Sequence, residues 1–196
     1  MTSKIIMTLV VLAAKVSVGG ASAAITPYWG FDSQADWETV AQEWNTIDFT
    51  GYEPWHHLSD EYEEAFGVVF TDHTNAVVPG AYQNDGWGLT TGSFGDYAMF
   101  ELTQPIEAIA FFHPGVVTVT LWIGDELIGE VGNNGGSAGF LGLTSDVPFD
   151  RVRIDDGADV AYVDDIRIGM AIPGPGAAGL VAVASVFGVG RRRRGS

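Results

Sequence analysis

The chain has 196 residues, which is long enough for one domain with a hydrophobic core but short for two. All 25 acidic residues lie between Asp32 and Asp165, and residues 24–171 contain only three basic residues, all arginines, so this body has a net charge of −22. Such a body repels a phosphate backbone, which argues against nucleic acid as a partner. Cations are its natural partners, and solubility in salty surroundings is the alternative explanation of the charge.

The absence of cysteine excludes disulfides, thiolate catalysis and cysteine zinc sites.

Residues 1–23 are predicted to be a secretory signal peptide. Lys4 precedes an apolar run from Ile5 to Ala14, and Ala21 and Ala23 mark a small-residue cleavage site. We expect the Sec machinery to export the chain and signal peptidase to cut it. A buried helix is the alternative interpretation.

The stretch 31–45 predicts one short amphipathic helix after the signal. Ser33 and Asp36 have the spacing of a capping box at its start. Its apolar residues recur at i, i+3, i+4 and i+7, namely Trp37, Val40, Ala41 and Trp44.

The rest of the body has the pattern of β-strands with turn residues between them. In the stretch 116–123, Val117, Val119 and Leu121 share one face, while Trp122 lies on the opposite face with two threonines. The predicted strands are 47–49, 67–70, 97–102, 108–113, 116–123, 126–131, 140–144, 149–154 and 160–169.

Short strands about ten residues apart predict a mainly β domain over residues 24–171. We expect an antiparallel, jelly-roll-like β-sandwich with one short N-terminal helix, flanked by a signal helix and a C-terminal hydrophobic helix. Jelly-roll carbohydrate-binding modules have a similar architecture, but a shared fold does not establish a shared function.

The sequence contains neither an HExxH motif nor a P-loop. The pattern GxSxG occurs once, at residues 135–139 in a Gly/Asn-rich loop, and GxGxxG once, at residues 174–179 in the proline-glycine break before the C-terminal apolar stretch, and such short matches do not by themselves establish a catalytic or dinucleotide site. With 25 carboxylates some pair must lie close together, so acidic pairs alone do not indicate glycoside hydrolysis. We therefore expect a non-catalytic protein, with a secreted glycan-active hydrolase as the alternative.

Calcium is the cofactor that the sequence favours, since hard cations take six to eight oxygen ligands. The candidate ligands crowd one loop and strand: Asp155, Asp156, Asp159, Asp164 and Asp165. The strand's alternation turns Val160, Tyr162, Ile166 and Ile168 toward the core, and places Asp164 inward with them. A solvated turn beside a β-bulge is the alternative.

A zinc site at the adjacent His56 and His57 is a weaker hypothesis, because neighbouring strand residues point to opposite faces.

Aromatic side chains suggest a glycan-binding surface, because sugar rings stack on indole and phenol rings. The candidates are Trp55, Tyr82, Trp87 and Trp122. Core packing is the alternative for each, since Trp is buried on average.

The C-terminal stretch 172–196 resembles the PEP-CTERM sorting signal of Gram-negative bacteria. That signal consists of a short proline motif, an apolar helix and an arginine cluster, and here Gly174 stands where the family usually has glutamate. The matching residues are Pro173, Gly174 and Pro175, then Ala177 to Gly190, then Arg191, Arg192, Arg193 and Arg194. The resemblance implies transient anchoring in the inner membrane and cleavage by an exosortase-type membrane protease. An ordinary membrane anchor is the alternative.

Together these patterns predict an exported cell-surface or extracellular-matrix protein that binds glycans, such as exopolysaccharide, or has a structural role in the matrix. Besides the hydrolase, a protein-binding adhesin or scaffold is the other alternative.

Overall fold

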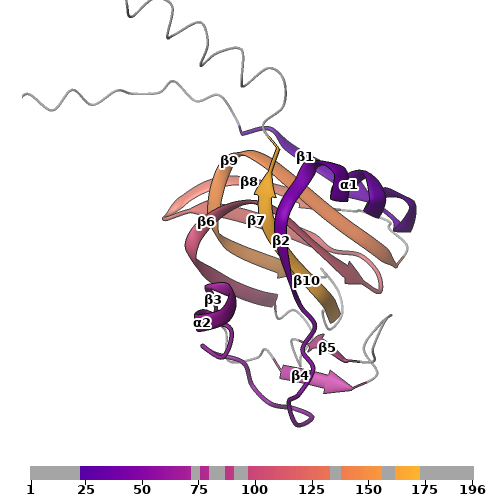
Figure 1. Ribbon diagram of the computed structural model, residues 1–196, viewed down its shortest axis with the longest axis vertical. Coiled ribbons are helices and arrows are strands. Elements are labelled where there is room, and N and C mark those ends of the chain that lie inside the picture. The colour runs from indigo at the N-terminus through magenta and orange to yellow at the C-terminus, as the bar shows by residue number, and fades with distance from the viewer. Residues whose placement is uncertain are drawn as a thin grey trace, which may run out of the picture.

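The computed structural model describes residues 23–71, 76–79, 87–90, 97–132, 138–155 and 162–172. This part of the chain is mainly β, and all of its strand pairs are antiparallel (Figure 1). The elements are β1 Ile25–Trp29, η1 Phe31–Ser33, α1 Gln34–Val40, β2 Ala41–Ile47, α2 Glu63–Phe66, β3 Val68–Phe70, β4 Ala76–Pro79, β5 Trp87–Thr90, β6 Tyr97–His113, β7 Thr118–Ile123, β8 Glu126–Gly132, β9 Gly139–Asp155 and β10 Tyr162–Ala171.

The strands form one sheet in the order β4-β5-β10-β6-β9-β7-β8, and β1, β2 and β3 add to β9, β10 and β6. The long strands β6 and β9 pair in two blocks. One block runs from Tyr97 opposite Asp155 to Glu101 opposite Arg151, and register shifts around Ile106 separate it from the second. Both strands curve strongly in Figure 1. The sheet therefore bends at the break between the blocks.

One hydrophobic core takes side chains from both blocks. Phe100 and Val152 come from the first block, and Phe111 and Leu141 from the second, and all four are fully buried. The sheet thus curls around a single core, because every second residue of β6 and β9 points into it in both pairing blocks.

A smaller apolar cluster lies on the other face of the second block, under α1. Trp37 is fully buried there against Ala108 and Ala110, and its Nε1–H donates to the Leu143 carbonyl at 3.2 Å. Gly142 makes room for the indole, since a Cβ at that position would lie 2.6 Å from Trp37 Cγ. Small residues on the sheet therefore leave the space in which Trp37 of α1 packs.

The mainly β prediction is confirmed, but the predicted helix 31–45 is wrong in its second half. Residues 41–47 form β2, which pairs antiparallel with β10. Pairing with β10 overrides the helical period, which is a tertiary effect that local propensity does not contain. The predicted capping box is also wrong, since the Ser33 hydroxyl donates to the Trp29 carbonyl at 2.8 Å.

Other strands differ from the predictions mainly in their bounds. β6 and β9 each join two predicted strands, whereas β1, β4 and β5 were not predicted. Of the predicted strand 47–49 only Ile47 is extended, because Asp48 and Phe49 begin a turn in which Phe49 has a φ of 58°. The alternation predicted for 116–123 is confirmed by the buried Val119 and Leu121.

β1 begins and β10 ends on the same side of the molecule, opposite β4 and β5 (Figure 1). Within the described ranges, no helix is long and apolar enough to cross a membrane. Residues 1–22 of the predicted signal and residues 173–196 of the predicted sorting tail lie outside those ranges.

Candidate functional site

The structure describes some of the predicted site residues and not others. Trp55, Trp87, Trp122, Asp164 and Asp165 are described, as are Asp155 and Ala23. Outside the described residues lie Ala21, Tyr82, Asp156, Asp159, Pro173, Gly174, Pro175, Arg191, Arg192, Arg193 and Arg194.

Nine residues of β6, β9 and β7 form the surface that we call the outer face. Their neighbours in sequence, such as Phe100, Val152 and Leu121, point into the core, so the alternate residues point outward. The strand register arranges the outward residues in three rows across the sheet: Glu101, Arg151 and Trp122; Met99, Arg153 and Thr120; Tyr97, Asp155 and Thr118.

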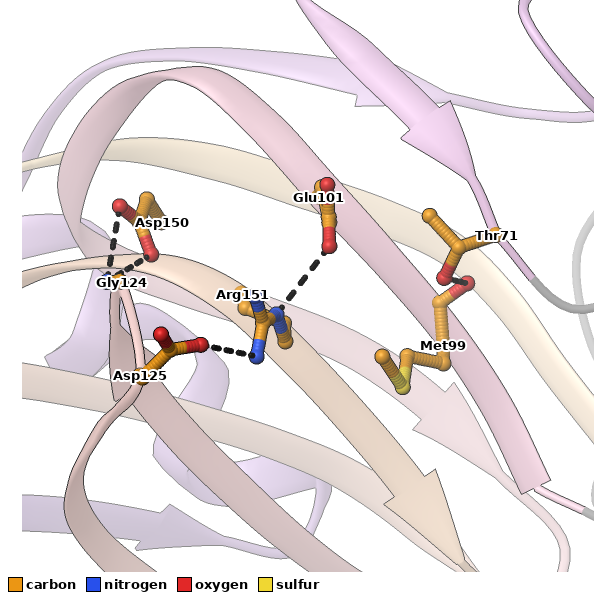
Figure 2. A network of polar contacts seen from close by, with 7 residues as sticks. All are labelled: Thr71, Met99, Glu101, Gly124, Asp125, Asp150 and Arg151. Carbon is orange, nitrogen blue, oxygen red and sulfur yellow. Dashed lines mark hydrogen bonds and ion pairs between the residues drawn. The ribbon is translucent and has the colours of Figure 1, made fainter.

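Arg151 is the centre of the first row. Its Nε donates to Glu101 Oε1 at 3.2 Å, and its Nη1 lies 3.9 Å from Asp125 Oδ1 in the turn after β7. That turn is held in place because the Gly124 N–H donates to both carboxylate oxygens of Asp150, at 2.8 and 3.1 Å. Figure 2 shows the Arg151 guanidinium between Glu101 and Asp125. The Arg151 side chain is 27% exposed, so these contacts orient it while it stays accessible.

Arg153 connects the other two rows. Its guanidinium carbon lies 4.0 Å from the centroid of the Tyr97 ring, and its Nη2 donates to Asp155 Oδ2 at 2.6 Å. In the middle row, the Thr120 hydroxyl donates to Glu130 of β8 at 3.4 Å. The Asp155 carboxylate, predicted as a calcium ligand, is therefore engaged by an arginine.

Trp122 is the aromatic candidate on the outer face. It is half-buried beside Arg151 and opposite Leu127, whose side chain is 58% exposed. Two separately predicted residues, Trp122 and Asp155, thus share one surface.

The other aromatic candidates lie elsewhere. Trp87 begins β5, which β10, β6 and β9 separate from β7, and it packs against the core. Trp55 is 64% exposed and has a φ of 68°, a strained value for a residue with a side chain. Its N–H donates to the Val77 carbonyl at 2.7 Å, which fixes the loop to β4. The structure therefore does not bring the tryptophans together in one site.

Asp164 is buried, at 1% exposed, but its register opposite Phe112 places it on the side of the cluster under α1 and not, as predicted, on the side of Ile166 and Ile168. Tyr162, predicted to point inward with it, is 38% exposed instead. The physical reason is a β-bulge: the register with β6 shifts between Asp164 and Arg167, and Asp165 has a φ of 49°. Asp164 Oδ1 accepts the Asp165 N–H at 2.9 Å. In the described part of the chain, no three His, Asp or Glu side chains gather to hold a metal ion.

The adjacent histidines have separate roles. His56 stacks on Tyr52 with ring centroids 4.9 Å apart, and its Nε2–H donates to Glu61 Oε1 at 2.8 Å, while His57 forms a backbone bridge to β4. Burial alone would raise the pKa of Glu61, but hydrogen bonds from the Ser59 N–H, from its own N–H and from His56 hold that pKa below its ordinary value. This pair thus orders a surface loop.

The residues of the outer face that sequence reasoning missed are Tyr97, Met99, Glu101, Arg151 and Arg153. The alternation of the predicted strands 97–102 and 149–154 places them outward, but strand register was needed to bring the two strands together.

The outer face offers an indole surface and two oriented charge pairs, which suits binding of a hydroxyl-rich ligand. No family model matches the chain, and no curated protein is detectably similar to it.

Proposed function

We propose that this chain is an exported, non-catalytic protein of a Gram-negative cell surface or extracellular matrix, and that it binds glycans on its outer face. The observation that carries the proposal is the row Glu101, Arg151 and Trp122, in which an aromatic surface adjoins an oriented charge pair.

The chemistry of this row fits a sugar chain. The apolar face of a sugar ring stacks on the Trp122 indole, and adjacent hydroxyls accept from Arg151 and donate to Glu101. Because the hydrogen bond to Glu101 already orients the Arg151 guanidinium, binding orders few additional side chains and costs little conformational entropy.

The proposed fold of the body is a jelly-roll-like β-sandwich. It is supported by the two pairing blocks of β6 and β9 and by the core they share. In such a sandwich the first block, with β7 and β8, forms one layer, and its outward side is the outer face.

Export is proposed from the predicted signal, residues 1–23, and from the sorting tail, residues 172–196. The tail holds the protein transiently in the inner membrane until a membrane protease releases it to the surface or matrix.

A glycan array probed with the full chain tests the binding function. We expect Trp122→Ala to weaken the strongest hit by about fivefold to tenfold, the size expected for one lost stacking contact. Trp44→Ala is the matched control, because Trp44 is partly exposed on β2, away from the outer face, and should leave binding unchanged.

Two results would overturn the proposal. An array without hits, together with calcium-driven self-association, would favour the scaffold function. Release of reducing ends from a bound polysaccharide would show that the protein is a hydrolase.

A further inference from the structure

A groove of about 340 Å³ lies at the bend of β6, apart from the outer face. Its residues come from β2, from α2, from the middle of β6 and from the end of β10. The apolar part is formed by Phe66, Leu102, Ile106, Ile168 and Met170, and the polar part by Glu43, Asn45, Glu63, Glu64, Thr103 and Gln104.

The wall between α2 and β6 is fixed by close backbone contact. The Thr103 N–H donates to the Gly67 carbonyl at 2.8 Å, and Gly67 has a φ of 68°. A Cβ on Gly67 would lie 2.5 Å from Thr103 Oγ1, so a side chain at this position would force Thr103 to move, and the positive φ also favours glycine. The groove is therefore formed before any ligand arrives.

The groove carries negative charge without a basic partner. Glu43, Glu63 and Glu64 line it, no lining residue is basic, and none of the three forms an ion pair with another described residue. The arginines of the body pair elsewhere: Arg151 with Glu101 and Asp125, Arg153 with Asp155, and Arg167 with Glu38. A concave surface lined by one sign of charge concentrates ligands of the opposite sign.

The acidic residues of the groove come from two elements, Glu43 from β2 and Glu63 and Glu64 from α2. A ligand that pairs with all three therefore reaches from one element to the other, as a chain with several positive groups can. Asn45, Gln104 and Thr103 both donate and accept hydrogen bonds, as hydroxyl groups do. The apolar part of the groove suits the apolar faces of sugar rings.

We propose that this groove binds a glycan whose sugars carry protonated amines, a chain of 2-amino-2-deoxyhexoses. The ammonium groups pair with Glu43, Glu63 and Glu64, and the ring faces lie on the side of Phe66 and Met170. This site is separate from the outer face, so it stands whether or not Trp122 binds a glycan.

Calorimetric titration of the full chain with a glucosamine hexamer tests the inference at mildly acidic pH. The N-acetylglucosamine hexamer is the matched probe, because it has the same backbone without the charge. We expect the glucosamine hexamer to bind at least about tenfold more tightly, with an affinity that falls as salt is added.

The double variant Glu63→Gln with Glu64→Gln should weaken this binding about tenfold, and Glu43→Gln alone should also weaken it. The charge-matched control, Asp32→Asn with Glu126→Gln, changes two exposed residues outside the groove and should retain it. If thermal unfolding shows that the α2 double variant is unfolded, Glu43→Gln becomes the deciding variant.

Three results would overturn the inference. Equal binding of both hexamers would remove the role of charge. Equal loss in the groove variants and the control would show attraction by the acidic body as a whole. A lysine hexamer that binds equally well and is equally weakened by the groove variants would make the site a general polycation site.

Discussion

His113 is a buried residue whose charge state depends on the fold. It is 3% exposed, its Nδ1–H donates to the Gly115 carbonyl at 2.7 Å, and its ring packs against Trp29 and Phe111. Burial holds the pKa of His113 below the ordinary value of 6.5, and the Gly115 bond opposes this shift in part.

The unfolded chain therefore binds a proton at this position more readily than the folded chain as pH falls below 6.5. Stability decreases in that range, by at most about 1.4 kcal/mol per pH unit from this group. We expect chemical denaturation at pH 7 and pH 5 to show this loss, and His113→Gln to reduce it. An equal loss in the variant would contradict the assignment.

Gly142 is a residue on which the packing of α1 against the sheet depends. An added Cβ would overlap the Trp37 indole and lie 2.9 Å from Phe140. We expect Gly142→Ala to lower the free energy of unfolding by about 1–3 kcal/mol, the cost of overpacking. Gly115→Ala is the control, since its Cβ would meet nothing within 4 Å. Equal stability of the two variants, measured by urea denaturation, would show that α1 shifts without cost.

At the scale of elements, an ion pair joins α1 to β10. Arg167 Nη1 donates to Glu38 Oε1 at 2.8 Å, and the Arg167 side chain is 12% exposed beneath the helix. The pair Arg151 with Glu101 is more exposed, at 27% and 49%.

Removing the Glu38 carboxylate of α1 leaves the largely buried Arg167 guanidinium without its acidic partner, whereas water screens the exposed pair of Arg151 and Glu101. We predict that Glu38→Gln costs about 1–2 kcal/mol and Glu101→Gln less than about 1 kcal/mol. Thermal unfolding of both variants measures the difference, and the reverse order would contradict it.

An element can be predicted from the sequence when its pattern lies within its own residues, and not when it depends on a pairing partner far along the chain. The alternation of apolar and polar residues within one strand predicted β7 and most of β6 and β9, because it shows which side of the strand is buried. β2 was predicted as helix, because Trp37, Val40, Ala41 and Trp44 fit a helical period while the pairing partner lies far along the chain. The bulge after Asp164 shifts the alternation of β10, so Tyr162 was placed on the wrong side.

The candidate site was predictable in part for the same reason. Trp122 could be placed outward from its own strand, whereas its neighbour Arg151 became visible only through the register between β7 and β9. The groove was not predictable, since it depends on the bend of β6 and on the approach of α2.

The body of the molecule is strongly acidic, with a net charge of −22 over residues 24–171. Mutual repulsion destabilises such a body, and salt shortens the range of that repulsion from about 30 Å at 0.01 M to about 3 Å at 1 M. The melting temperature should therefore rise with NaCl over that range, and a flat or falling curve would contradict this explanation.

At matched ionic strength, a larger rise of the melting temperature with CaCl₂ than with MgCl₂ would support the calcium site predicted at Asp155 to Asp165, and equal curves would contradict it.

The central claim is that glycans bind on the outer face rather than at the other aromatic residues. The chain has six tryptophans, and the indole N–H signal of each can be followed by NMR while the best ligand from the array is added. The account predicts that Trp122 and the amides of β7 and of β9 from Arg151 to Asp155 shift most. Shifts centred on Trp55 or Trp87, with Trp122 unchanged, would contradict it.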